Sequence, residues 1–314
     1  MIKLLFINKS SFYKHSSAIH VGFISWLQNK YNVIEYGRKS GFFKQHVSHR
    51  GFGQYRNFFL SYKPDVILTY NSNGSRLYKK NKDRLSWAKN IIEYSSFLKI
   101  HITTDHCQRG DDPEQTSWFK EFGIDVALFR HKSFERHPVG IESHWFPFSI
   151  DRESYLDDNF KFFNKSKKIG FIGALNKDLY VDRNIAFKFL DSNNLINYSK
   201  KRRIGKDYFS FLQSNIANLT CGGTCRYFTA KYIEILASGA LLICSDTDGL
   251  STIPSDFYLK YDPQNMDGFV DKYLQKINSK GFQKTLRISR EYALVKHSHK
   301  KRFKQLDKII KSRI

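Results

Sequence analysis

The chain has 314 residues, of which 52 are Lys or Arg and 29 are Asp or Glu, so its formal net charge is +23. This length suits two domains, and a hydrophobic content of 41% with 16% aromatic residues can fill two packed cores, which excludes an unfolded chain. The charge indicates an anionic partner or surface. No apolar run approaches the ~20 residues of a membrane span, and the few cysteines form no framework of spaced pairs. We therefore expect a cytoplasmic protein, at most peripheral to a membrane.

Strands and helices are expected to alternate through the first half of the chain. Short apolar runs predict strands at 2–7, 32–35, 64–69, 99–103 and 124–129. The intervening segments predict helices at 18–30, 77–89 and 91–98. Such alternation is typical of a parallel sheet covered by helices. The sequence thus predicts a Rossmann-like α/β domain.

A basic and aromatic segment lies between residues 37 and 62. Its cations are interleaved with phenylalanines and a tyrosine, which is the composition of proteins that hold nucleic acid by backbone contacts and base stacking. The alternative is an aromatic-rich helix packed on the sheet. The candidate polyanion contacts in this segment are Arg38, Lys39, Lys44, Arg50 and Arg56.

Charged residues crowd the loop that follows the predicted strand at 99–103. Open α/β sheets bind ligands at the carboxyl ends of their strands, so a catalytic base could come from this loop. Asp105 and His106 are the candidates for that base, and Arg109 is a further candidate contact to a polyanion. The alternative is that aspartate and glycine simply form turns here.

A proline between two phenylalanines at 146–148 predicts an extended linker. We therefore place a first α/β domain at 1–150 and a second at 151–314. The second domain is expected to open with a strand at 168–173, whose continuation from Gly173 to Asn176 is a weak phosphate-binding signal. Asp182 is predicted to cap the helix that follows.

A candidate phosphate contact and a further helix follow in the second domain. Gly205 and Lys206 are expected to end a strand, which makes Lys206 a candidate phosphate contact; the alternative is a solvated lysine. Apolar residues at helical spacing then predict one helix that starts at Asp207 and carries Tyr208, Phe211, Leu212, Ile216 and Leu219 on its buried face.

The stretch from Arg226 to Gly249 is predicted to form a complete α/β unit. Thr229 is an acceptable N-cap, Gly239 a natural helix stop, and 240–244 a buried strand. Lys231, Glu234 and Ser238 form a second stripe on the helix. This stripe is either a solvated face or a sugar-nucleotide site, where helix amides and a lysine attract a pyrophosphate and a glutamate accepts the ribose hydroxyls.

The string KYIEILASGALLIC at 231–244 resembles the donor-binding signature of GT-B glycosyltransferases, particularly the spore-maturation-type group and the bacterial and phage members that are similar to families 1 and 4. IGFIGALNKDLYVDR at 169–183 resembles the first strand and loop of their nucleotide-binding domain, and HWFPFSIDRESY at 144–155 their interdomain linker. The resemblance implies two Rossmann-like domains facing a cleft: 1–150 on the acceptor side, and 151–314, with the basic C-terminal helix, binding the nucleotide sugar. It also implies that Glu234 binds the donor ribose. Many retaining members carry a glutamate where this chain has Arg226, so the resemblance does not carry over the stereochemistry.

The donor-binding candidates, taken from pattern and resemblance together, are Gly173, Asn176, Lys206, Arg226, Tyr227, Thr229, Lys231 and Glu234. Asp246-Thr247-Asp248 spells the D-x-D of metal-dependent glycosyltransferases of another fold, but it follows the strand of a GT-B-like unit, so we expect no metal. The chain from 280 to 314 is helical in pattern and very basic, which indicates contact with a polyanion, the alternative being a solvated face.

The sequence therefore predicts a metal-independent glycosyltransferase that needs no cofactor and takes its sugar from a nucleoside diphosphate donor, with UDP as the expected nucleotide. The favoured acceptor is a hydroxymethylated pyrimidine in DNA, as some phage enzymes use, because the positive charge exceeds what a small donor requires; the protein would then act in the cytosol of an infected host. One alternative is an enzyme that extends an envelope glycan at an anionic membrane. The other is a nucleic-acid-binding module that has lost catalysis.

Overall fold

The computed structural model describes residues 1–8, 23, 26–36, 63–71, 96–103, 119–120, 123–132, 140–152, 155, 162, 164–175, 178–201, 203, 205–223 and 226–314. The chain divides into two compact units: unit 1 contains the described residues up to Pro147 together with Arg302–Ile314, and unit 2 those from Phe148 to Lys301. The sequence-based scheme places the boundary at Ile150 and the whole C-terminal helix in the second domain, so the two divisions differ in where that helix belongs.

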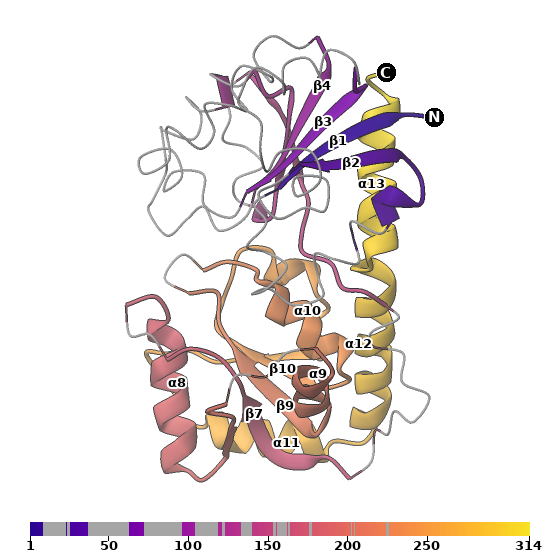
Figure 1. The fold of residues 1–314 in the computed structure, drawn as a ribbon. Coiled ribbons are helices and arrows are strands. Elements are labelled where there is room, and N and C mark those ends of the chain that lie inside the picture. Colours follow the sequence, from indigo (N-terminus) through magenta and orange to yellow (C-terminus); the bar gives the residue numbers. More distant parts are fainter. Residues whose placement is uncertain are drawn as a thin grey trace. The chain divides into compact units, whose positions relative to one another are not determined.

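Unit 1 is built on a six-stranded parallel sheet in the order β2-β1-β3-β4-β5-β6 (Figure 1). Its strands are β1 (Lys3–Asn8), β2 (Asn32–Tyr36), β3 (Val66–Asn71), β4 (Leu98–Thr103), β5 (Val126–Phe129) and β6 (Glu142–Trp145). The first five confirm the predicted strands. The sixth is missed by the sequence analysis because it lies at the sheet edge, is only half-buried and has a polar sequence, ESHW. The helices predicted at 77–89 and 91–98, and most of that at 18–30, lie outside the described residues.

The C-terminal helix α13 (His299–Lys311) is amphipathic. Its buried side chains Phe303, Leu306, Ile309 and Ile310 join the core of unit 1, which also contains Leu4, Val66, Ile100 and Val126. The hydroxyl of Tyr31 donates a hydrogen bond of 2.6 Å to Asp307 on the same helix. The basic tail is therefore more than a solvated charge run, because one of its faces completes a hydrophobic core.

Unit 2 is built on a five-stranded parallel sheet in the order β11-β10-β9-β7-β8 (Figure 1). Its strands are β7 (Ser166–Phe171), β8 (Ile196–Tyr198), β9 (Asn215–Thr220), β10 (Leu241–Cys244) and β11 (Tyr258–Lys260). Its helices are α8 (Val181–Ser192), α9 (Lys206–Gln213), α10 (Ala230–Ala237), α11 (Phe269–Asn278) and α12 (Phe282–Lys296). Two parallel sheets of this kind confirm the predicted α/β class with two Rossmann-like domains.

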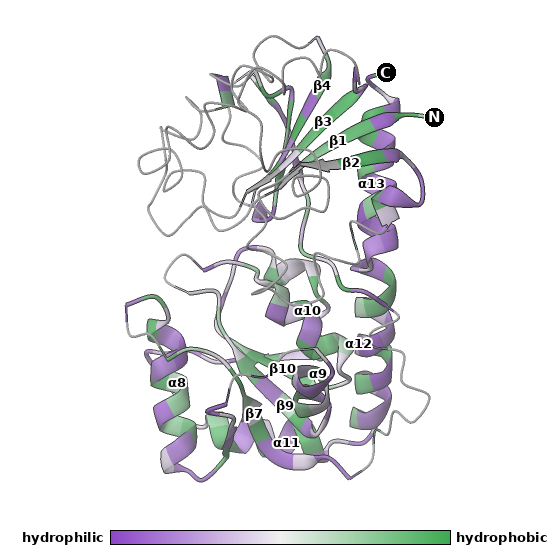
Figure 2. Ribbon diagram, in the orientation of Figure 1, coloured by the Kyte–Doolittle hydropathy of each residue, from purple (hydrophilic) through white to green (hydrophobic). Residues whose placement is uncertain are grey.

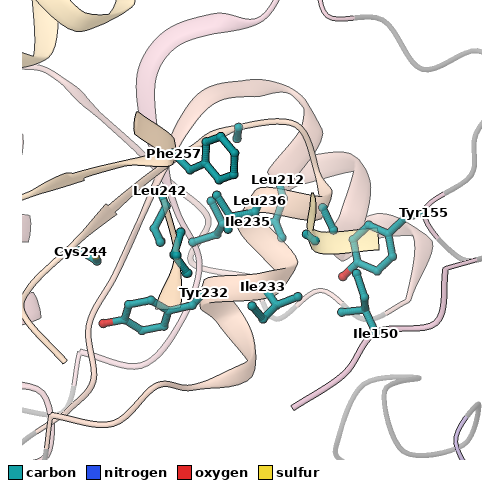
Figure 3. Close-up of a cluster of buried hydrophobic side chains, with 14 of the residues drawn as sticks. Ile150, Tyr155, Leu212, Tyr232, Ile233, Ile235, Leu236, Leu242, Cys244 and Phe257 are labelled. Carbon is teal, nitrogen blue, oxygen red and sulfur yellow. The ribbon is translucent and has the colours of Figure 1, made fainter. Parts of the chain in front are cut away.

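Helices cover both faces of the unit 2 sheet. In β10, Leu242 and Cys244 pack in one cluster with α9, α10 and α12 (Figure 3), whereas Leu241 and Ile243 pack in another with α8 and α11. This alternation follows from the two-residue period of a strand. Because both faces are buried, the strand is apolar throughout, as its colour in Figure 2 shows.

The helix predicted from Asp207 through Leu219 is wrong in its second half. Helix α9 ends at Gln213, and the following six residues form the central strand β9, all of them buried. The side-chain amides of Asn215 and Asn218 donate to the carbonyls of Phe211 and Leu212, at 2.6 and 2.9 Å. They thereby satisfy carbonyls that the helix end leaves open. A fully buried strand and a buried helix segment cannot be separated by periodicity alone.

Two local predictions around the helix starts are also wrong. Asp182 does not cap α8; the N-cap is Tyr180, and Asp182 lies inside the first turn. Gly205 does not end a strand but is the N-cap of α9, with a positive φ of 57° that favours glycine.

Among the described residues, no helix combines the length and the apolar composition needed to cross a bilayer.

Candidate functional site

The end of β7 and the start of α10 meet at a lysine. The ammonium of Lys231 donates a hydrogen bond to the carbonyl of Ile172, just beyond the carboxyl end of β7. A Cβ atom on Gly173 would lie 2.6 Å from that ammonium nitrogen, so glycine at this position leaves the space that the lysine occupies. The carboxyl ends of parallel strands are where open α/β sheets bind ligands. The predicted Gly173 and Lys231 are thus brought together at such an end.

One turn further along α10, Glu234 is buried with a side chain only 3% exposed. Its Oε2 accepts a hydrogen bond of 2.6 Å from the hydroxyl of Tyr208 on α9. Burial raises the pKa of the Glu234 carboxyl, and the Tyr208 hydrogen bond and the charge of Lys231 lower it in part. Ser238 on the same stripe is fully buried. The interpretation of this stripe as a solvated face is therefore wrong, because the helix packs this side inward.

A second cation, Arg183 from α8, reaches the same place. Its side chain is 4% exposed, its Nη1 donates to the carbonyl of Ala174 at 3.0 Å, and its guanidinium lies 3.9 Å from the ring centroid of Tyr180. Its Nε is buried and has no hydrogen-bond partner among the described residues. Arg183 was not predicted as a site residue, since an arginine inside an unremarkable helix gives no signal in the sequence.

The two cations and the carboxylate leave local positive charge in excess. Burial, and after it the charge of Arg183, lower the pKa of Lys231 to about 8, although Glu234 and Cys221 act in the opposite direction. Arg183 is buried and Lys231 is half-buried, and two such cations close together are costly unless an anion compensates them. The arrangement suits an anionic ligand that lies beside Gly173.

Two tyrosines surround the carboxylate. Besides Tyr208, the hydroxyl of Tyr155 is buried without a hydrogen-bond partner among the described residues. Burial raises its pKa well above the ordinary value, and the nearby Glu234 and Tyr208 raise it further. Figure 3 shows Tyr155 beside Ile150, at the edge of the hydrophobic cluster that also contains α10. The sequence pattern predicts Tyr208 only as a core residue of a helix and Tyr155 only as part of the linker.

The loop before α10 contains three further predicted site residues. Arg226 is exposed and adopts a positive φ of 53°, Tyr227 is buried, and Thr229 is the N-cap of α10. Thr229 has the predicted position but makes no side-chain hydrogen bond to the helix. The loop passes so close to Gly222 that a Cβ there would lie 2.5 Å from the backbone nitrogen of Tyr227. Glycine at 222 therefore allows this loop to approach the sheet.

The remaining predicted residues are not brought into this cluster by a described contact. Lys206 is the exposed first residue of α9, and the carboxylate of Asp246 is exposed, 3.8 Å from the ammonium of Lys260. The other predicted catalytic, donor and acceptor residues lie outside the described residues: Arg38, Lys39, Lys44, Arg50, Arg56, Asp105, His106, Arg109 and Asn176.

No protein-family model matches the chain, and no curated protein matches its sequence. Solved structures do match it. Sucrose-phosphate synthase from Thermosynechococcus elongatus has a TM-score of 0.68 at 11% identity, over 99% of this chain and 99% of that chain. A glycosyltransferase from Rickettsia africae has 0.68 at 10% identity, over 99% and 98%. HepE from Anabaena, in complex with UDP-glucose, has 0.67 at 9% identity, over 99% and 100%.

These structures share the GT-B fold, and the chain has that fold too. The prediction of two Rossmann-like domains of the GT-B type is confirmed. At identities this low the likeness establishes the fold alone, so the activity has to be argued from the site.

Proposed function

We propose that the chain is a glycosyltransferase that takes its sugar from a UDP-sugar bound by unit 2. The observation that carries the proposal is the cluster of the buried Arg183 and Glu234 with the half-buried Lys231 at the carboxyl end of the sheet, in a chain with the GT-B fold. The complexes of Anabaena HepE with UDP and with UDP-glucose support the choice of nucleotide.

In this proposal the charged residues of the cluster bind different parts of the donor. Glu234 accepts hydrogen bonds from the ribose hydroxyls, as a buried carboxylate with a free oxygen can. Lys231 and Arg183 lie against the diphosphate, and the first amides of α10, which no side chain caps, add to them. The exposed Lys206 supplements this charge. No cofactor takes part.

Transfer follows from this arrangement. The acceptor hydroxyl attacks the anomeric carbon, its proton passes to a base, and the bond between that carbon and the diphosphate oxygen breaks. The electron pair leaves on UDP, where Lys231, Arg183 and the helix amides stabilise the charge that develops. These groups supply the role that a divalent cation has in other transferases, so we propose a reaction without metal. The candidate bases remain Asp105 and His106.

We propose DNA with hydroxymethylated pyrimidines as the acceptor. The net charge of +23 supports this choice, because a nucleotide sugar needs only a few cations. Helix α13 presents an exposed row of basic side chains opposite its buried face, at Lys300, Lys304, Lys308 and Lys311. The basic segment with Arg38 and Arg56 adds further positive charge in the sequence.

A glycan at an anionic membrane is the second candidate acceptor, and one observation favours it. Helix α12 exposes Ile288 and Val295, at 50% and 46%, on a face that also exposes Lys284, with Glu291 as an acidic residue on the same face. Apolar and basic side chains on one face are typical of surfaces that rest on anionic lipid. The cluster at Glu234 opposes the third hypothesis, a module that has lost catalysis.

The test has two stages. A screen of nucleotide sugars should find one that stabilises the chain against heat, by about 2.7 kcal/mol at a hundredfold excess over its dissociation constant. That donor is then incubated with the enzyme and DNA containing hydroxymethylated pyrimidines, and mass spectrometry should find a base heavier by one sugar. Unmodified DNA, together with transfer to a lipid-linked or polysaccharide acceptor, would refute the DNA acceptor. If no nucleotide sugar binds, the proposed activity itself is refuted.

A further inference from the structure

We infer that Tyr208 is a positioning residue that holds Glu234 for the recognition of the two ribose hydroxyls, so that the site selects ribonucleotide over 2′-deoxyribonucleotide donors. This inference rests on the proposed function and deepens it. Helical spacing alone predicts Tyr208 only as part of a buried helix face.

The contact joins two short helices. Tyr208 lies in the first turn of α9 and Glu234 in the middle of α10, and the phenol donates to Oε2 at 2.6 Å. The other carboxylate oxygen, Oε1, accepts no hydrogen bond from the described residues. It is not fully buried, so a ligand can reach it. One oxygen is therefore held by the protein, and the other is left for a ligand.

The contact also keeps opposite charges apart. Lys231 and Glu234 are three residues apart on one helix, a spacing at which such pairs usually bond to each other. Here they form no ion pair within 4.0 Å: the lysine donates to the Ile172 carbonyl, and the glutamate accepts from Tyr208. Each charge thus stays available for a different part of the ligand. Without the phenol, the flexible glutamate side chain would be free to turn toward the lysine and lose that availability.

Selectivity follows from the chemistry of the held carboxylate. Two adjacent hydroxyls on ribose can both donate to one carboxylate, whereas 2′-deoxyribose offers only one. A buried charged acceptor that loses a donor is penalised by its desolvation. A site built around such hydrogen bonds therefore rejects an analogue that lacks the hydroxyl.

The test is Tyr208→Phe, which removes one oxygen atom and keeps the ring. Dissociation constants for UDP and 2′-deoxy-UDP are measured by calorimetry. We expect the wild type to bind UDP about 10- to 100-fold more tightly than 2′-deoxy-UDP. In the variant this ratio should be about tenfold smaller. The matched control is Tyr273→Phe in the same unit, which removes a phenol that donates to the Lys167 carbonyl at 2.6 Å. Its preference for UDP should equal that of the wild type.

The pH dependence of UDP binding gives a second readout. The groups that face Glu234 are Tyr208, Lys231 and Tyr155. The Tyr208 hydrogen bond lowers the pKa of this carboxyl, so its removal raises that pKa further. UDP affinity, which falls as the carboxylate is protonated, should then begin to fall at a higher pH in Tyr208→Phe than in the wild type. If Tyr208 only supported the fold, UDP affinity would begin to fall at the same pH in the variant and in the wild type.

A double variant completes the design. If Tyr208 acts through Glu234, adding Tyr208→Phe to Glu234→Gln should change the preference for UDP no further. Equal losses of affinity for UDP and 2′-deoxy-UDP in Tyr208→Phe, or no loss for either, would overturn the positioning role while leaving the proposed function intact. If the wild-type chain binds neither nucleotide, the proposed function fails and the inference fails with it.

Discussion

The sharpest prediction concerns Gly173→Ala. A Cβ at this position would lie 2.6 Å from the ammonium nitrogen of Lys231 and 3.4 Å from Nη1 of Arg183. The first distance is shorter than contacts that real side chains make, so the ammonium has to move away from the Ile172 carbonyl. Because the displaced atom is the end of a flexible side chain, the domain should still fold. The substitution therefore perturbs the cation without removing it.

The expected loss of UDP affinity follows from the hydrogen bond between Lys231 and the diphosphate, which the displaced ammonium can no longer make. A hydrogen bond from a charged group contributes about 1.5–3 kcal/mol. If Lys231 holds the donor diphosphate from its present position, Gly173→Ala should weaken UDP binding by about 10- to 150-fold. Uridine, which lacks phosphate, should bind the variant and the wild type equally.

Calorimetric titration with UDP and with uridine checks this expectation, and thermal unfolding checks the fold. The matched control is Gly222→Ala, where the added Cβ would lie 2.5 Å and 2.6 Å from backbone atoms of Tyr227 and Arg226. Backbone cannot move aside as a lysine can, so this control should lower the unfolding temperature. Unchanged UDP affinity in folded Gly173→Ala, or equal losses for UDP and uridine, would refute the assignment of Lys231 to the diphosphate.

Three further predictions address charge and metal. Glu234→Ala should weaken UDP binding at least about tenfold and lower the free energy of unfolding by about 1–3 kcal/mol, because it leaves the Tyr208 hydroxyl without its acceptor; unchanged calorimetric affinity in a folded variant would contradict the ribose contact. UDP affinity should fall as the pH rises through about 8, because Lys231, whose pKa is lowered by burial and by Arg183 against the opposite effect of Glu234 and Cys221, loses its charge there; titrations from pH 6.5 to 9.5 in which the affinity stays flat would argue against it. Sugar transfer should continue in EDTA; loss of turnover that manganese or magnesium restores would instead indicate metal binding by the D-x-D turn after β10.

Much of the fold could be predicted from the sequence because its signals are local. The strands around Leu4, Ile67 and Leu242 are short apolar runs between turn residues, and such runs are what a parallel sheet buries. The α10 unit could be predicted in the same way, since Thr229 and Gly239 bound a helix whose pattern needs no distant partner. The placement of Lys231 and Glu234 on the same side of this helix is also a matter of spacing within one element.

Other features depend on contacts between distant parts of the chain. Ile216 and Leu219 continue the helical spacing of α9, and only the pairing of β9 with β7 and β10 makes them a strand. The positive charge of the C-terminal helix can likewise be read from the sequence. That its face with Phe303 and Leu306 packs into the core of unit 1 can be seen only in the structure.

The same distinction holds for the candidate site. Residue spacing is enough to place a glutamate and a lysine on one helix after a glycine-ended strand. Packing between helices then buries Glu234, brings Tyr208 from α9 to one of its oxygens, and adds Arg183 from α8 as a second cation beside Gly173. The physical reason is that burial and hydrogen-bond partners are properties of packed elements, and neither helix spacing nor residue type specifies which helices will meet.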